Sequence, residues 1–147
     1  MSVEPRTKAI LLTAAVLALL LATIVGLVYF RRISSVGIIK TVGCDVFWDN
    51  ALTQRVTLID WGMVEPGSQN NKSVYIKNTS NVPAKLTLGT ENWNPSVASD
   101  YITLYWNYDN RTLSVGEAIP VAFTLAVASN ISGVTNFNFD IVIIASG

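Results

Sequence analysis

The chain has 147 residues, enough for one domain and a membrane segment, and half of them are hydrophobic. Ten basic and ten acidic residues balance overall, but from Ile33 onward six basic residues stand against nine acidic ones, so no basic patch is left for nucleic acid. The chain has no histidine and a single cysteine, Cys44, which excludes a zinc site and a Ser-His or Cys-His relay. A single cysteine also excludes an intrachain disulfide. We expect neither enzyme activity nor a cofactor.

The first predicted element is an apolar helix. A basic leader, residues 1–8, precedes 22 uncharged residues, 9–30, that are rich in Leu, Ala, Val and Ile. As a helix this segment spans roughly 33 Å, the thickness of the hydrocarbon core of a bilayer. The sequence therefore predicts a transmembrane helix over residues 9–30, followed by a linker over residues 31–35. A cleaved secretory signal is the alternative, although the segment is long for one and no small-x-small cleavage site follows it.

Lys8 and Ala9 open a further alternative for this segment. Lys8-Ala9 directly before the apolar run resembles the processing site of archaeal type IV pilins and archaellins. The resemblance covers the first 30 residues and the general architecture. It implies processing of the leader at Lys8 and Ala9, packing of the apolar helix into a filament core, and an immunoglobulin-like sandwich outside that core. Ala14 departs from the family pattern, because many type IV pilins carry glutamate there.

The charges that flank the apolar segment do not decide its orientation. Arg6, Lys8 and the amino terminus lie before it, and Arg31, Arg32 and Lys40 follow it. These are nearly equal numbers under the positive-inside rule. We expect the domain to be extracellular because its β composition is rich in asparagine and poor in lysine, and because it carries several acceptor sequences for glycosylation.

Residues 36–147 are predicted to form an all-β domain. Short segments of alternating apolar and polar residues are separated by turn residues, and no helical periodicity competes with them. Seven strand-like runs are expected, over residues 36–48, 56–61, 74–76, 84–88, 102–106, 121–127 and 137–143. Seven strands in about 110 residues predict an immunoglobulin-like or Greek-key β-sandwich.

One turn and the strand after it carry a second resemblance. Pro66-Gly67, followed by residues 77–83, resembles bacterial and archaeal surface domains in which a Pro-Gly turn precedes a strand ending in Asn-Thr-Gly-Asn. Ser80 replaces the glycine of that pattern here. Camelysin-like biofilm-fibre proteins are similar in this respect, and the resemblance implies a sandwich that polymerises by lending strands between subunits.

Asparagine acceptors are the first candidate sites. Four Asn-x-Ser/Thr sequences lie in or beside predicted turns, and their acceptors are Asn71, Asn78, Asn110 and Asn130. Their placement favours glycosylation on an exported surface.

Tryptophan and acidic side chains are the remaining candidates. The four tryptophans are expected to pack in the core, except Trp93, which lies in an expected loop over residues 92–95 and is a candidate for glycan contact. Asp45 with Asp49, or Asp109 with neighbouring carbonyls, offers oxygen ligands for calcium, but no spaced acidic loop exists and no metal site is predicted. Cys44 is expected to be a buried, small apolar side chain.

Two functions are compatible with these features. The first is a non-enzymatic structural protein of the cell surface, a subunit of an extracellular filament, pilus or envelope layer that is assembled through its hydrophobic helix or by strand exchange between copies. Residues 33–48 form a long, partly apolar segment that can complete either its own sandwich or the sheet edge of a neighbour. The second is a membrane-tethered module that binds glycans or a partner protein.

Overall fold

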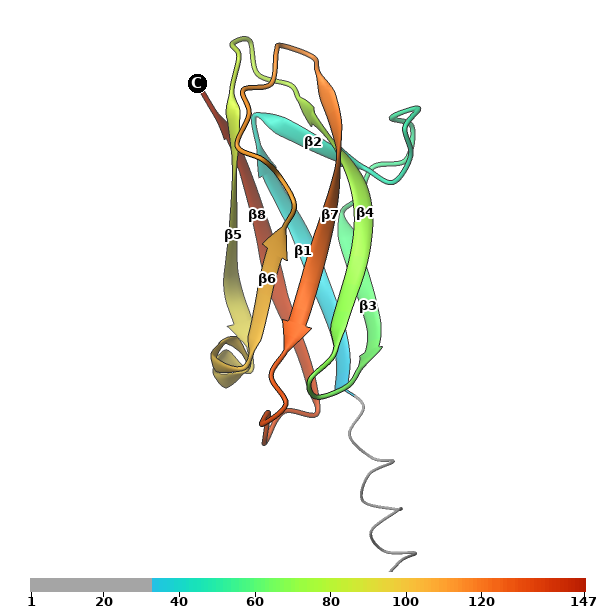
Figure 1. The fold of residues 1–147 in the computed structure, drawn as a ribbon, viewed down its shortest axis with the longest axis vertical. Helices are drawn as coiled ribbons and strands as arrows, with labels where there is room; N and C mark the ends of the chain where they lie inside the picture. The colour runs from blue at the N-terminus through green and yellow to red at the C-terminus, as the bar shows by residue number, and fades with distance from the viewer. Residues whose placement is uncertain (1–32) are drawn as a thin grey trace, which may run out of the picture. The chain divides into compact units, whose positions relative to one another are not determined.

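Two four-stranded sheets lie face to face in the computed structural model, which describes residues 33–147 (Figure 1). This arrangement confirms the all-β prediction. Residues 1–32 lie outside the described residues. They include the predicted leader with Lys8, the apolar segment that begins at Ala9, and residues 31–32. Within residues 33–147, no helix combines the length and the apolar character needed to cross a bilayer.

The strand order is β3-β1-β8-β5 in one sheet and β2-β4-β7-β6 in the other. The strands are β1 (Ile33–Val42), β2 (Cys44–Phe47), β3 (Leu58–Val64), β4 (Gln69–Asn78), β5 (Lys85–Asn94), β6 (Ile102–Trp106), β7 (Ala118–Val127) and β8 (Asn136–Ser146). A short 3₁₀ helix, η1 (Ser96–Asp100), connects β5 to β6.

The core lies between the sheets, and alternate residues of β7 and β8 supply much of it. Phe123 and Leu125 of β7 and Phe139 and Ile141 of β8 are almost completely buried, which confirms the predicted alternation in both strands. Each such side chain contributes roughly 1.5–3 kcal/mol on burial. Because the chain has only one cysteine, which is free, this packing stabilises the fold without a disulfide.

The predicted single strand over residues 36–48 is wrong, because Gly43 divides it. Gly43 has a φ of +69°, a left-handed conformation that glycine adopts readily, and the chain crosses there from one sheet to the other. The crossing also reverses the direction in which the even-numbered side chains point. Val42 in β1 faces solvent, whereas Cys44 and Val46 in β2 are buried.

Two predicted boundaries also differ from the structure. The expected linker over residues 31–35 is too long, since β1 already begins at Ile33 and the side chains of Ile33 and Ser35 are buried. The expected loop over residues 92–95 is wrong as well, because β5 continues to Asn94 through a β-bulge. Asn92 takes a φ of 54° in this bulge, which re-aims its side chain toward β8.

The first and last strands of the sandwich are neighbours and run in parallel. β1 pairs with β8 in continuous register from Ser34 opposite Asn136 to Val42 opposite Ile144. The other strand pairs are antiparallel, and β1 is flanked on its far side by β3. β1 is therefore an interior strand of its sheet and completes the sandwich of its own chain.

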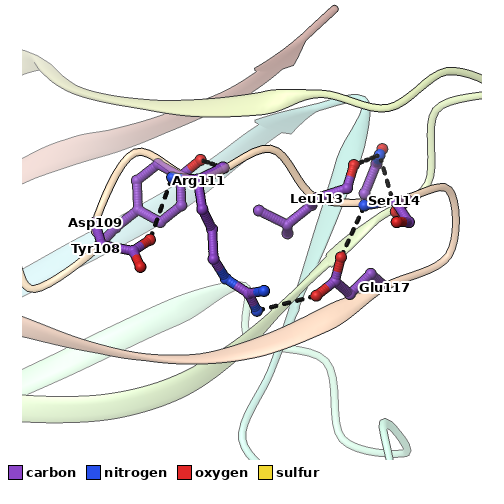
Figure 2. Close-up of polar contacts among 7 residues, drawn as sticks. Tyr108, Asp109, Arg111, Leu113, Ser114 and Glu117 are labelled. Carbon is purple, nitrogen blue, oxygen red and sulfur yellow. Dashed lines mark hydrogen bonds and ion pairs between the residues drawn. The ribbon is translucent and has the colours of Figure 1, made fainter.

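A polar network ties the loops at one end of the sandwich (Figure 2). The hydroxyl of Tyr108 accepts a hydrogen bond from the buried amide of Leu86 and donates one to the carbonyl of Arg111. Glu117 pairs with Arg111 at 3.0 Å and accepts a hydrogen bond from the amide of Ser114 at 2.8 Å. The long connection between β6 and β7 is therefore held by specific bonds.

Candidate functional site

The outer face of the sheet β3-β1-β8-β5 carries several exposed apolar side chains. Ile38, Leu58, Val42 and Ile144 are 45%, 46%, 61% and 40% exposed. In register, Ile38 lies opposite Leu58 and Val42 lies opposite Ile144, with the half-buried Val142 between the two pairs on β8. We call these five residues the apolar outer patch. Scattered apolar side chains are common on protein surfaces, and a group of them on one face is a candidate interaction surface.

The other sheet presents a different outer face. Its exposed positions on β4 include Asn71 and Ser73, and β6 contributes Thr103. The hydroxyl of Thr124 on β7 donates a hydrogen bond of 2.7 Å to Asn71 on β4 across this face. A solvated sheet face normally has this polar character. The same face also exposes Tyr105 of β6, at 43%, so it mixes polar and apolar side chains.

Lys40 lies on the same face as the apolar outer patch, and its ammonium is paired with two carboxylates. The ammonium of Lys40 lies 2.6 Å from a carboxylate oxygen of Asp140 and 3.1 Å from one of Glu91. Asp140 is only 7% exposed and also accepts a hydrogen bond of 2.7 Å from the amide of Asn92. Lys40 and then Asn92 lower the pKa of Asp140, while Asp140 and then Glu91 raise the pKa of Lys40. Both groups of the pair therefore remain ionised at neutral pH.

The apolar outer patch is open on the side of β5. Gly89 lies opposite Val142, and a Cβ atom added at Gly89 would have no atom within 4 Å. No side chain of β5 therefore covers Val142 at this position, and the face is accessible to a flat partner surface.

The edges of the sheets are less suited to contacts between chains than this face. In the second sheet the edge strands β2 and β6 have only four and five residues. In the first sheet the pairing of β3 with β1 and of β5 with β8 is interrupted by irregular register. Short and bulged edges are features that prevent the addition of a foreign strand. β4 is the exception, because its pairing with β2 covers only Tyr75–Asn78 and does not extend over Gln69–Val74. The edges formed by β2, β3, β5 and β6 are therefore protected, and the outer face is the other candidate surface for association.

The four predicted glycosylation acceptors lie in different environments. Asn71, Asn110 and Asn130 are exposed, on β4, in the β6–β7 loop and in the β7–β8 turn. Asn78 is fully buried, and its amide nitrogen donates hydrogen bonds to the carbonyls of Val82, Leu113 and Ser114. A glycan on that nitrogen is incompatible with this packing, so the prediction of glycosylation at Asn78 is wrong for the folded domain.

Trp93 lies in a strand and packs on the core. Its ring stacks on Phe139 with a centroid distance of 4.2 Å and an interplanar angle of 6°, and its indole nitrogen donates to Thr90. One ring face is therefore already occupied by the protein. This geometry favours the packing role, which the sequence assigned to the other tryptophans, over a platform for sugars.

The acidic candidates and the cysteine are engaged by protein groups. Asp45 pairs with Arg55 at 2.7 Å, and the carboxylate of Asp49 accepts hydrogen bonds from Thr53 and Gln54, which lower its pKa. Among residues 33–147, no group of three or more metal-ligating side chains comes together. Burial raises the pKa of the Cys44 thiol to about 11, so Cys44 is a packed and unreactive side chain.

No protein-family model matches this chain, and the comparison with curated proteins finds no similar sequence.

Proposed function

We propose that this chain is a non-enzymatic structural protein of the cell surface, whose copies associate through the apolar outer patch while residues 9–30 hold them at the membrane. The single observation that carries the proposal is the exposure of Ile38, Val42, Leu58 and Ile144 on one sheet face, on both sides of Lys40. The expected product is an extracellular filament or envelope layer, in keeping with the resemblance of Lys8-Ala9 and the apolar run to pilin leaders.

A second copy of the chain is the occupant that we propose for the apolar outer patch. Lys40 and its partners Asp140 and Glu91 carry one positive and two negative charges, so two like faces oppose a net negative charge that the apolar contact must offset. Removing apolar surface from water then contributes about 25 cal/mol per Å². A symmetric contact between identical surfaces closes after two copies, so the patch would pair chains, and the further contacts of a filament or layer would come from the apolar helix over residues 9–30.

If residues 9–30 anchor the chain in a membrane, a second copy in the same membrane is the most available partner. Chains anchored by residues 9–30 in one membrane meet at a high effective concentration, so a modest patch is sufficient for association. The exposed acceptors Asn71, Asn110 and Asn130 lie off this sheet, and glycans there would leave the apolar outer patch free.

The fold itself supports a further part of the proposal, an immunoglobulin-like class of sandwich. Such sandwiches carry a buried tyrosine at a loop corner, whose hydroxyl bonds to nearby backbone, and Tyr108 makes bonds of this kind with Leu86 and Arg111. Most connections in this domain also cross from one sheet to the other, as in Greek-key folds.

The proposal is tested by placing a charge in the apolar outer patch. Val42→Lys puts an ammonium at the most exposed apolar position of the patch, and Val115→Lys does the same at a 55% exposed valine in the β6–β7 loop. Full-length protein is expressed in cells, which are examined by electron microscopy, and the extracted protein is sized by sedimentation. Wild type and Val115→Lys are expected to form the same assemblies, and Val42→Lys is expected to lose them.

Two results would overturn self-association. The first is normal assembly of Val42→Lys with an unchanged circular dichroism spectrum. The second is wild-type protein that sediments as a single copy while Val42→Lys, but not Val115→Lys, loses a cross-link to another protein. That result would instead establish the alternative function, a membrane-tethered module for a partner protein. The glycan version of that module predicts a fluorescence response to polysaccharides that Trp93→Ala abolishes.

A further inference from the structure

The pairing of the first and last strands determines how the domain responds to stretching. β1 and β8 are parallel, so the start of β1 at Ile33 lies at the same end of the sheet as the start of β8. The end of β8 therefore lies at the opposite end from Ile33 (Figure 1). A force applied between the two ends of the domain acts along the strands and pulls β1 and β8 in opposite directions.

This direction of force loads the hydrogen bonds of the β1–β8 ladder together. Nine residue pairs, from Ser34–Asn136 to Val42–Ile144, stay in register without interruption. In such a shear geometry the strands separate only when many bonds break at once. When two strands are peeled apart from one end, by contrast, each bond of about 0.5–1.5 kcal/mol breaks in turn. The resistance of the same kind of ladder therefore depends on the direction of pulling.

Neighbouring contacts hold β1 in place during such loading. On its far side β1 pairs with β3 from Ile33 opposite Val64 to Ile38 opposite Leu58. The ion pair between Lys40 and Asp140, at 2.6 Å, joins β1 and β8 through their side chains. β1 cannot slide along β8 without breaking both ladders and this ion pair.

We infer that the β1–β8 pair is a mechanical clamp, which keeps the sandwich folded when it is stretched between the segment before Ile33 and the end of β8. The clamp is a property of the sandwich alone. The proposed tether by residues 9–30 would deliver force to it, but the resistance itself does not require self-association.

Single-molecule stretching of the full-length chain in detergent tests the clamp in two directions. Handles on Ser34→Cys and on a cysteine appended after Gly147 pull β1 against β8. Handles on Lys85→Cys and on the same appended cysteine peel β5 from β8, because Lys85 lies opposite Ser146 in an antiparallel pair. Ser34 and Lys85 are exposed, and the buried Cys44 thiol, with its pKa raised to about 11, does not compete for the handles.

The expected result is a rupture force severalfold higher for the Ser34 attachment than for the Lys85 attachment at the same loading rate. Equal forces in the two directions, or a higher force for peeling, would overturn the clamp. Equal melting temperatures of the two cysteine variants serve as the control that both are folded. A monomeric wild-type protein would overturn the proposed self-association and leave this comparison intact.

Discussion

The amide of Leu86 at the start of β5 donates a hydrogen bond of 3.1 Å to the hydroxyl of Tyr108, which follows β6. The same hydroxyl donates to the carbonyl of Arg111. One side chain thus joins the edge strand of one sheet to the loop that leaves the edge strand of the other. Because both the ring of Tyr108 and the amide of Leu86 are buried, water has no access to replace this bond.

Tyr108→Phe is expected to destabilise the domain by about 1–3 kcal/mol, because the buried amide of Leu86 loses its partner without any loss of ring volume. Urea unfolding of the full-length chain in detergent, followed by tryptophan fluorescence, measures the change. Tyr105→Phe is the matched control, since Tyr105 is 43% exposed on β6 and should lose almost nothing. Similar free energies for the two variants would contradict the assigned role of the hydroxyl.

Gly37 and Gly89 are both glycines within strands, and they predict opposite effects of one methyl group. A Cβ at Gly37 on β1 would lie 2.9 Å from Cδ1 of Ile141 and 3.2 Å from the indole nitrogen of Trp61. Gly37→Ala is therefore expected to cost about 1 kcal/mol, the lower end for overpacking, because Cδ1 is the end of the Ile141 side chain and can move, whereas the Trp61 ring has less freedom. Gly89→Ala meets no atom within 4 Å and is expected to be neutral or to stabilise by up to about 1 kcal/mol. The two melting temperatures are compared directly, and equal shifts would contradict the packing at Gly37.

The alternation of apolar and polar residues was sufficient to predict which strands pack one face into the core. Phe137, Phe139 and Ile141 alternate with polar residues, and burial of one side of β8 follows directly from that pattern. The same rule does not predict that Ile38 and Val42 face solvent while Cys44 and Val46 are buried. Ile38 and Val42 face solvent because the second sheet covers only the other face of β1, and no residue near them in the sequence specifies that arrangement.

The environment of Asn78 was likewise not predictable from nearby residues. Its amide is held by the carbonyls of Leu113 and Ser114, which lie 35 and 36 residues further along the chain. An acceptor sequence in a turn-rich segment has the same local signature whether its asparagine is exposed or enclosed. The apolar outer patch and the buried position of Asn78 therefore both depend on pairing between distant segments.

Asn78→Asp is expected to destabilise the domain by at least about 2 kcal/mol. The side chain keeps its size, but a carboxylate has no hydrogens to donate, whereas the two amide hydrogens are now shared among three carbonyls. Asn81→Asp, at an exposed position in the following loop, is the matched control for the added charge. The change is measured by urea unfolding, and two equal losses of stability would contradict the enclosed amide.

The same burial predicts the pattern of glycosylation. If the chain is glycosylated in an expression host that modifies Asn-x-Ser/Thr sequences, peptide mapping of the folded, exported protein should find glycans only at Asn71, Asn110 or Asn130. Asn78 should be unmodified, because its amide nitrogen has no exposed surface in the folded domain. Folded protein that carries a glycan on Asn78 would contradict the structure.

The ion pair between Lys40 and Asp140 predicts how stability depends on pH. The folded pKa of Asp140 is lowered, chiefly by Lys40, so its contribution is present above the usual aspartate pKa of about 4 and is lost as the pH falls through the folded value. The folded pKa of Lys40 is raised above 10.5, chiefly by Asp140, so its contribution is lost only as the pH rises through that higher value.

Lys40→Met should therefore melt below wild type at neutral pH, and the difference should shrink in acid below about pH 4. Lys85→Met, which removes a lysine from β5 that has no ion pair within residues 33–147, should show no such convergence. A gap between Lys40→Met and wild type that stays constant from neutral to acidic pH would show that the pair does not couple to folding.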